Sequence, residues 1–403
     1  MSLTPALEPL ASQGGTPVRA AYLPLCVPSI GAREKQLVLE VLDSGWLTTG
    51  ARAQELATRI AGLAGAPHGL ALSSATAALH LALVSLGVKP GDEVVTSTYT
   101  FAACVNVIEH AGAKPVLVDV EADTLCLDPR AVEAALTPRT KAILTVDYGG
   151  HPCDYDALLP LARARGVPIV EDAAHALGAA WRDRPVGSFA DVTAFSFYAT
   201  KNLTSGEGGA AVTGDAELAE RMAVLSLHGM NRDAWKRYTG AGTWYYEVTS
   251  PGYKYNLSDV LAAIALGQLE RFEEMQARRR AHVARYDAQL ADVPEVRRPA
   301  TRPHVRHAWH LYPIALELER LRCDRARFLA ELRAENVGSS VHFIPIHLHP
   351  YFRSTLALPP AGFPVAEDAY HRAVSLPLFP AMTERDVDDV CAAVRKVVAH
   401  FKR

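Results

Sequence analysis

The sequence predicts an α/β fold, in which a mostly parallel central sheet has helices on both faces and is followed by a small C-terminal α+β domain. Short apolar runs alternate with helical patterns throughout residues 69–214, which is typical of a parallel sheet. From about Pro294 the order changes to scattered strands and helices, which is typical of an α+β unit. We expect residues 1–256 to form an N-terminal segment and a large domain, and residues 257–403 a linking helix and a small domain.

Composition favours a globular enzyme. The chain has 403 residues, enough for two domains, with 49% apolar and 21% charged residues. A net charge of −3 does not indicate binding to nucleic acid or to an anionic membrane. No apolar stretch approaches the ~20 residues of a membrane helix. No secretory signal is evident, so we expect a cytoplasmic protein. The six cysteines are scattered without a C-x-x-C pair, which argues against a metal site and a disulfide framework.

The N-terminal half predicts its elements in a clear order. Helical patterns cover 30–42 and 51–64, and a strand over 69–73 leads into a helix over 77–86. Residues 91–112 predict a strand, a loop and a helix. A strand over 114–120, a helix over 128–136, a strand over 142–146 and a helix ending near 165 follow.

The centre of the chain, residues 167–213, carries two charged groups at strand ends. The apolar run 167–170 ends in Glu171 and Asp172, and the run 192–197 leads directly to Lys201. Charged groups are costly in such surroundings unless they have partners. A lysine that forms a Schiff base needs a lowered pKa, and a pyridinium nitrogen needs an anion such as Asp172. The alternative is an ordinary buried ion pair, and the two residues alone do not decide between them.

A phosphate site is also indicated. Residues 73–76 join a strand to a helix N-terminus, where free N–H groups and the helix dipole attract anions, although a plain Ser/Thr cap is the alternative. Ser196 and the segment 205–209 are further candidates. Phe101 could stack on a flat ring or belong to the core. Because ligands bind beyond the carboxyl ends of parallel strands, the fold would gather Thr76, Phe101, Asp172 and Lys201 at one edge.

The C-terminal half is less regular. A helix over 216–227 precedes an aromatic, irregular stretch over 228–253, which is either functional, an interface or a surface flap. We expect one long helix over 257–283, strands over 307–316 and 340–343, and helices over 325–335 and 384–401. The three histidines of residues 342–352 favour a substrate-lining loop over a metal site, since no carboxylate or cysteine is interleaved.

Many short segments in order resemble one family, the DegT/DnrJ/EryC1/StrS sugar aminotransferases. They are GWLTTG, SSATAALHLAL, GDEVVTSTYTFAA, VEDAAHALGA, FSFYATKNLTSGEGG, PGYKYNLSDVLAAIALGQL, HAWHLYPI, VHFIPIHLHPYF and LPLFPAMTE. The resemblance covers almost the whole chain. It implies the aminotransferase fold of type I, with the cofactor pyridoxal 5′-phosphate (PLP) in the large domain. It is strongest to sugar 4-aminotransferases, such as those that make UDP-4-amino-4-deoxy-L-arabinose.

The resemblance implies a role for each of several residues. Lys201 would carry the Schiff base, Asp172 would pair with the pyridinium nitrogen, and His175 would lie against the ring. Other expected cofactor contacts are the stacking ring of Phe101, the phosphate ligands Ser196, Ala75 and Thr76, and either Lys254 or Asn256 from a neighbouring subunit. The residues expected to face the sugar nucleotide are Thr48, Thr49, Trp235, Tyr246, His342 and His347.

The implied reaction is transfer of an amino group from L-glutamate, which leaves 2-oxoglutarate, to a nucleotide-linked keto-sugar. The acceptor would be carbon 4 of a UDP- or other NDP-linked 4-keto-6-deoxy sugar or 4-keto-pentose, in a pathway of aminosugar or polysaccharide biosynthesis. A homodimer with shared sites is expected. The alternatives are a carbon-3 aminotransferase, a PLP-dependent sugar dehydratase, which Lys201 disfavours, and a non-catalytic regulatory homologue. A dinucleotide-binding oxidoreductase is weakly supported, since no G-x-G-x-x-G follows the first strand.

Overall fold

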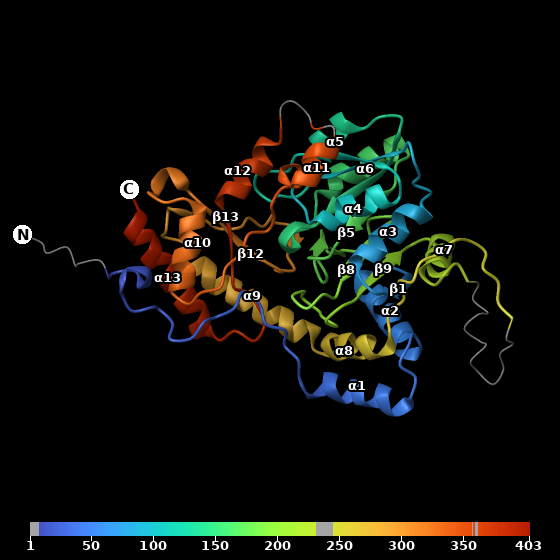
Figure 1. The fold of residues 1–403 in the computed structure, drawn as a ribbon, viewed down its shortest axis with the longest axis horizontal. Coiled ribbons are helices and arrows are strands. Elements are labelled where there is room, and N and C mark those ends of the chain that lie inside the picture. Colours follow the sequence, from blue (N-terminus) through green and yellow to red (C-terminus); the bar gives the residue numbers. More distant parts are fainter. Residues whose placement is uncertain (1–7, 231–244, 357, 359–361) are drawn as a thin grey trace, which may run out of the picture.

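The largest sheet of the protein has seven strands in the order β1-β9-β8-β5-β4-β2-β3, in a computed structural model that describes residues 8–230, 245–356, 358 and 362–403. Strands β8, β5, β4, β2 and β3 pair in parallel, and β9 runs antiparallel to both its neighbours, β1 and β8. Figure 1 shows this sheet on the side of the molecule away from the two termini. The predicted α/β class and mostly parallel sheet are confirmed.

Helices cover both faces of this sheet. The strands are β1 (His68–Leu72), β2 (Glu93–Ser97), β3 (Lys114–Val118), β4 (Thr140–Val146), β5 (Ile169–Asp172), β8 (Val192–Ser196) and β9 (Gly209–Thr213). One face packs on α3 (Ala75–Ser85), α4 (Ala102–His110) and α7 (Ala216–Ser226). The other packs on α2 (Ala51–Ala64), α5 (Pro129–Ala135), α6 (Tyr155–Arg165) and α8 (Asp259–Glu270), with α1 (Ala32–Ser44) outside α8. Burial on both faces explains the continuous apolar runs of the strands.

A second, antiparallel sheet of three strands lies in the C-terminal part. Its order is β10 (Val296–Arg297), β12 (Tyr312–Leu316) and β13 (Ala373–Leu376). Around it pack α9 (Phe272–Gln289), α10 (Arg325–Ala334) and α13 (Glu384–Phe401), and a separate apolar core here also takes in Leu10 and Leu23 of the N-terminal segment. Figure 1 shows α8 and α9 running from one sheet to the other. The domain boundary at residue 257 stays a prediction.

Short elements complete the described chain. They are the 3-10 turns at Ala11–Gln13, Tyr148–Gly150, Leu318–Arg320 and Ile346–Leu348, the helices α11 (Pro350–Thr355) and α12 (Pro364–Arg372), and a small sheet of β6 (Ala180–Trp181), β7 (Arg184–Pro185) and β11 (Val305–Arg306). Of the helices in the residues described, none is long and apolar enough to cross a membrane.

Three predicted elements were wrong in extent or kind. The helix expected over 257–283 is two helices, α8 and α9, which meet at Arg271, whose guanidinium donates hydrogen bonds to Glu34 of α1. The strand expected over 307–316 is limited to Tyr312–Leu316, because residues 308 and 310 donate N–H bonds to Gly150 and Gly149. No strand forms over 340–343, where Ser340 makes a single bridge to Ser375.

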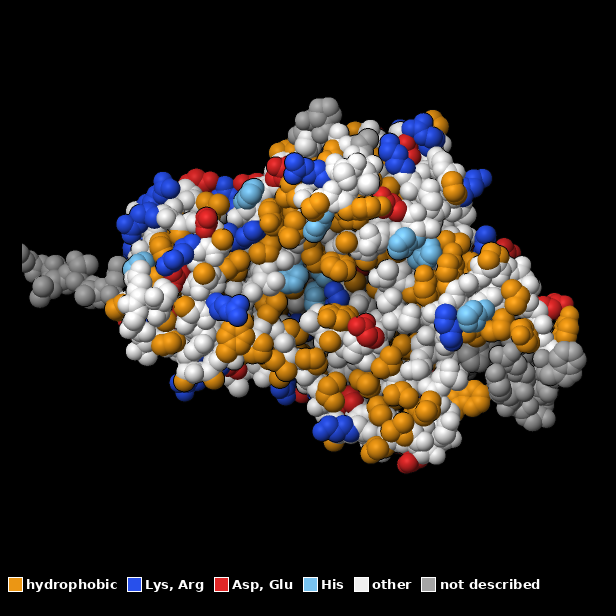
Figure 2. All heavy atoms as spheres, viewed as in Figure 1, with side chains coloured by type: hydrophobic (Ala, Val, Ile, Leu, Met, Phe, Trp, Pro, Cys, Tyr) orange, Lys and Arg blue, Asp and Glu red, His pale blue; other side chains and the backbone are white. Residues whose placement is uncertain are grey.

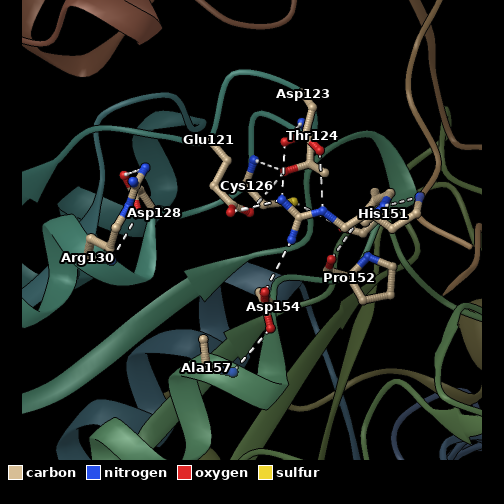
Figure 3. A network of polar contacts seen from close by, with 11 residues as sticks. Glu121, Asp123, Thr124, Cys126, Asp128, Arg130, His151, Pro152, Asp154 and Ala157 are labelled. Atoms are coloured by element: carbon tan, nitrogen blue, oxygen red, sulfur yellow. Dashed lines mark hydrogen bonds and ion pairs between the residues drawn. The ribbon is translucent and has the colours of Figure 1, made fainter. Parts of the chain in front are cut away.

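A charged network fastens the segment before β11 to the large sheet (Figure 3). The guanidinium of Arg302 pairs with Glu121 at 2.8 Å, Asp123 at 3.2 Å and Asp154 at 3.3 Å. Asp154 also caps α6 by accepting the N–H of Ala157. Burial lowers the pKa of Arg302, but the carboxylates of Glu121 and Asp123 outweigh this effect and raise it. The network therefore links two parts of the chain that lie far apart in sequence.

Candidate active site

A cavity of about 680 Å³ opens at the carboxyl ends of the parallel strands. Figure 2 shows, near the middle of one face, a hollow where histidine and Lys or Arg side chains lie among hydrophobic ones. The sequence places polar groups here because β4, β5 and β8 all end at this edge. Predicted site residues that line the cavity are Ala75, Thr76, Phe101, Asp172, His175, Ser196, Lys201 and His342.

Asp172 is the last residue of β5, and its carboxylate is buried. Its Oδ1 accepts a hydrogen bond of 3.0 Å from the N–H of Ala174, and its Oδ2 accepts one of 2.9 Å from Sγ of Cys104. Burial raises the pKa of Asp172, whereas the hydrogen bonds from Cys104 and Ala174 and the charge of Lys201 oppose this rise. Two donors thus support a carboxylate that desolvation disfavours.

Lys201 lies in the loop that follows β8, and β8 is the strand that pairs with β5. Burial lowers the pKa of Lys201 to about 8, and the charge of Asp172 acts in the opposite direction. Among the ion pairs of the described residues, none joins Lys201 to Asp172 within 4.0 Å. The alternative of an ordinary buried ion pair therefore does not describe these two groups. A lysine that is partly neutral near physiological pH is a competent nucleophile and base.

The N-terminus of α3 supplies an anion site on one side of the cavity. Ser74 caps the helix by accepting the N–H of Ala77 at 3.0 Å, so the cap leaves the first two N–H groups, of Ala75 and Thr76, for a ligand. A Cβ on Gly209 would lie 2.5 Å from the nitrogen of Ala75, so the glycine allows β9 to pack tightly against this turn. Ser196 ends β8 and also lines the cavity.

Three histidines border the cavity on the side of the C-terminal part. The rings of His175 and His310 are 4.3 Å apart, and the ring of His175 lies nearly parallel to that of Phe343. Burial lowers the pKa of all three, that of His342 to about 4, so they are neutral at physiological pH. The N–H of Gly149 donates to Nδ1 of His175, which leaves the proton of this ring on Nε2.

Several residues that line the cavity were not predicted. His310 and Phe343 come from segments that were expected to be strands but fold as loops, and Tyr198 comes from the loop after β8. Glu207 also lines the cavity, and it falls within the segment 205–209 that was named as a candidate. The segments HAWHLYPI and VHFIPIHLHPYF contain His310 and Phe343, and the position of Phe343 directly after the predicted His342 was the available signal for that ring. Phe101 is 62% exposed, which excludes the core alternative for this ring.

The other predicted residues lie outside the cavity lining of the described chain. Nζ of Lys254 donates to Oδ1 of Asn256, whose Nδ2 donates to Oγ1 of Thr49 at 2.6 Å. The ring of His347 is buried between Thr98 and Glu367. Thr48 and Tyr246 are exposed, and Trp235 lies outside the residues described. The roles of all these side chains stay predictions.

The lining fits PLP chemically. The cofactor has an aldehyde, a ring nitrogen and a phosphate, and the cavity offers a lysine of lowered pKa, a supported carboxylate and a helix N-terminus. The exposed ring of Phe101 and the buried ring of His175 border the space between these groups. The three kinds of group come from separate strand ends that the sheet brings together.

Comparisons with known proteins agree with this fit. The model of the DegT/DnrJ/EryC1/StrS aminotransferase family matches residues 28–395. The spore coat polysaccharide biosynthesis protein SpsC of Bacillus subtilis is 48% identical over 381 residues, which are 94% of this chain and 98% of SpsC. Spr1654 of Streptococcus pneumoniae, described as a sugar aminotransferase, has a solved PLP form with a TM-score of 0.87 and 33% identity over 94% of this chain and 99% of that one. DesI, solved with its TDP-sugar product, has a TM-score of 0.85 and 34% identity over 96% of this chain and 95% of its own.

Proposed function

The chain belongs to the DegT/DnrJ/EryC1/StrS aminotransferase family as a PLP-dependent sugar aminotransferase, and we propose that it aminates carbon 4 of a nucleotide-linked 4-keto sugar. The proposed amino donor is L-glutamate, which leaves as 2-oxoglutarate. The proposed acceptor is a UDP- or other NDP-linked 4-keto-6-deoxy sugar or 4-keto-pentose.

The observation that carries the proposal is the placement of Lys201 and Asp172 in one cavity without an ion pair between them. The cavity of about 680 Å³ falls in the range of small-molecule sites, ~300–1,000 Å³. The groups that fit the cofactor lie at the strand ends, and His342 and Phe343 line the wall formed by the C-terminal part. A substrate that binds between the strand ends and this wall would contact the cofactor-binding groups on one side and His342 and Phe343 on the other.

Lys201, Asp172 and His175 divide the chemistry. When bound, PLP supplies an electron sink for the carbon that exchanges its amino group. We assign the proton transfer to Nζ of Lys201, which would take the proton from that carbon of the donor and give it to the aldehyde carbon of the cofactor. For the acceptor sugar, the same amine would move the proton in the reverse direction. The carboxylate of Asp172 would hold a proton on the ring nitrogen, and the uncharged ring of His175 would pack beside the cofactor. Ala75, Thr76 and Ser196 would hold the phosphate by N–H and hydroxyl donors.

The structure of DesI in the presence of its TDP-sugar product supports a nucleotide-linked sugar as the substrate, and the name of SpsC supports a role in polysaccharide biosynthesis. The loop with Thr48 and Thr49, together with Trp235, Tyr246, His342 and His347, would face this substrate. Of these, His342 lines the cavity, and its Nδ1 lies 2.9 Å from Oγ of Ser375, which fixes the ring and leaves Nε2 for a sugar hydroxyl or phosphate oxygen.

We also propose a homodimer with shared sites. Exposed apolar side chains gather on α1 and the loop after it, where Figure 2 shows a hydrophobic surface, and others lie at the cavity mouth: Leu39, Leu42, Trp46, Leu47, Phe101 and Tyr198. Large apolar patches mark interfaces. The side chain of Lys254 is exposed, and its Nζ donates to the neutral amide of Asn256. In the dimer, Lys254 or Asn256 would reach the phosphate site of the other protomer. An active monomer in gel filtration would contradict this.

A substrate panel tests the proposed reaction. The PLP-loaded protein is first mixed with L-glutamate and freed of 2-oxoglutarate, and the loss of visible absorbance is recorded. Keto-sugar nucleotides that differ in base and in the position of the carbonyl are then added. We expect a 4-keto sugar to restore the absorbance and to yield a 4-amino product by NMR. A 3-amino product would move the acceptor to carbon 3, a deoxygenated product would indicate a dehydratase, and no response to any sugar would overturn the proposal.

A further inference from the structure

Cys104 on α4 contacts Asp172, and unlike Asp172 it is not among the described residues that line the cavity. Its side chain is 0% exposed, and its Sγ is 2.9 Å from Oδ2 of Asp172. We propose that Cys104 is a positioning residue, whose thiol fixes the carboxylate of Asp172 and lowers its affinity for a proton. This inference rests on the proposed function only in assuming that Asp172 faces the ring nitrogen of bound PLP.

The direction of this hydrogen bond follows from burial. Burial and the neighbouring charge of Asp172 raise the pKa of Cys104 well above its usual value, so the sulfur keeps its proton. A carboxylate can only accept, hence the thiol donates to Oδ2. The hydroxyl of Thr100 lies 3.1 Å from the same sulfur. Since the single thiol proton is used on Asp172, the hydroxyl of Thr100 donates to the sulfur.

The hydrogen bonds from Thr100 to Cys104 and from Cys104 to Asp172 end at the carboxylate of Asp172. Oδ1 of Asp172 accepts the N–H of Ala174 and Oδ2 accepts the thiol, so the plane of the carboxylate is held by one bond to each oxygen. The remaining lone pairs are free for a ring nitrogen in the cavity that Asp172 lines. Without the thiol, burial alone would raise the proton affinity of Asp172.

The consequence concerns one shared proton. It lies between the carboxylate of Asp172 and the ring nitrogen of bound PLP, and the more basic partner holds it. Cys104 makes Asp172 the weaker base and so keeps the proton on the ring, where it strengthens the electron sink. The alternative is that Cys104 is a small apolar core residue, because it also packs with Val107 and Ile108 of α4.

A matched pair of variants separates these two roles. Cys104→Ser keeps a donor of nearly the same size, whereas Cys104→Ala removes the donor together with the sulfur atom. Cys391→Ala is the control, since Cys391 is equally buried but lies on α13, in the core of the C-terminal part. Each protein is loaded with PLP, and the apparent pKa of its visible absorption band is measured by pH titration. Thermal unfolding of the apoproteins reports any purely structural damage.

We expect Cys104→Ala to raise the apparent pKa of the band by about one unit, because a ring nitrogen without its proton no longer repels a proton elsewhere on the cofactor. The value of kcat should fall about tenfold with little change in KM. Cys104→Ser and Cys391→Ala should titrate like the unchanged protein. Thr100→Val, which removes only the second donor, should give a smaller shift in the same direction.

Equal shifts in Cys104→Ala and Cys104→Ser, or no shift in either, would overturn the inference. If Cys104→Ala does not fold, Cys104→Ser and Thr100→Val still decide it by the same titration. Absence of a visible band in the unchanged, PLP-treated protein is a different result, since it contradicts the proposed function itself.

Discussion

Lys201 and Asp172 reach the same cavity from two neighbouring strands, β8 and β5, yet form no ion pair among the contacts of the described residues. Both groups are buried, and burial favours the neutral form of each. It lowers the pKa of Lys201 to about 8 and raises the pKa of Asp172. Two ionisable groups held apart in a desolvated site are costly for stability. Their separation is understandable if a ligand lies between them.

Substitution of Lys201 tests its role in turnover. Lys201→Ala should lower the rate by about 10²–10⁴-fold or more, because both the covalent anchor and the proton carrier are lost. The visible absorption band of the protein-bound cofactor should disappear as well. Lys89→Ala, at an exposed position in the loop before β2, is the control and should behave like the unchanged protein. Survival of the band in Lys201→Ala would refute the assignment.

Substitution of Asp172 should separate activity from stability. Asp172→Asn has the same shape but cannot hold a proton on the ring nitrogen, so kcat should drop by about 10²–10³-fold. Because burial already raises the pKa of Asp172, the apoprotein should lose no thermal stability. Calorimetry of the apoprotein beside steady-state kinetics checks both statements. A variant that is as active as the parent would remove Asp172 from the site.

Cofactor uptake should depend on the protonation of Lys201. The amine must be neutral to react, and its pKa in the apoprotein is lowered to about 8. The rate of PLP uptake should therefore rise ~tenfold per pH unit below pH 8 and level off above it. Since the charge of Asp172 raises the pKa of Lys201, the midpoint in Asp172→Asn should move to lower pH. Stopped-flow absorbance measures this, and a rate independent of pH would contradict it.

The sheet and the two principal site residues could be predicted from sequence because they depend on local patterns. Apolar runs such as residues 192–196 give strands wherever they are buried on both faces, and parallel strands bring their carboxyl ends together. The sequence thus placed Asp172, Lys201 and the turn at Ser74 at one edge. The donor from Cys104 to Asp172 was not predicted, because it joins residues 68 positions apart on different elements.

The elements that differ were decided by tertiary contacts. Arg271 ends α8 because its guanidinium bonds to Glu34 and Ser29, which no helical periodicity reveals. Residues 340–343 contain β-branched and aromatic side chains, yet they form a loop whose His342 carbonyl accepts from the hydroxyl of Tyr148 at 2.5 Å. Contacts of this kind brought His310 and Phe343 to the cavity, so these residues escaped a prediction based on periodicity.

Two buried acids, Asp147 after β4 and Glu171 in β5, should make the free energy of unfolding depend on pH. Burial and the charge of Glu171 raise the pKa of Asp147 well above its usual 3.8, and burial raises that of Glu171. The folded protein then keeps a proton that the unfolded chain releases, so the contribution of this pair to stability is fully present below about pH 4. It should fall as pH rises, by up to ~1.4 kcal/mol per unit for each retained proton.

Asp147→Asn removes this dependence, since the amide needs no proton. Urea unfolding of the apoprotein across pH should give a flatter profile for Asp147→Asn than for the parent. Asp43→Asn, at an exposed position near the end of α1, is the control and should leave the profile unchanged. Identical profiles for all three proteins would show that Asp147 does not retain a proton in the folded state.

The most direct measurement is borohydride reduction of the PLP-loaded protein, followed by proteolysis and mass spectrometry of the peptides. Reduction makes the bond between cofactor and lysine permanent. We expect the added mass on the peptide that contains Lys201, and its loss from that peptide in Lys201→Ala. Cofactor mass on another lysine, or on none, would contradict it.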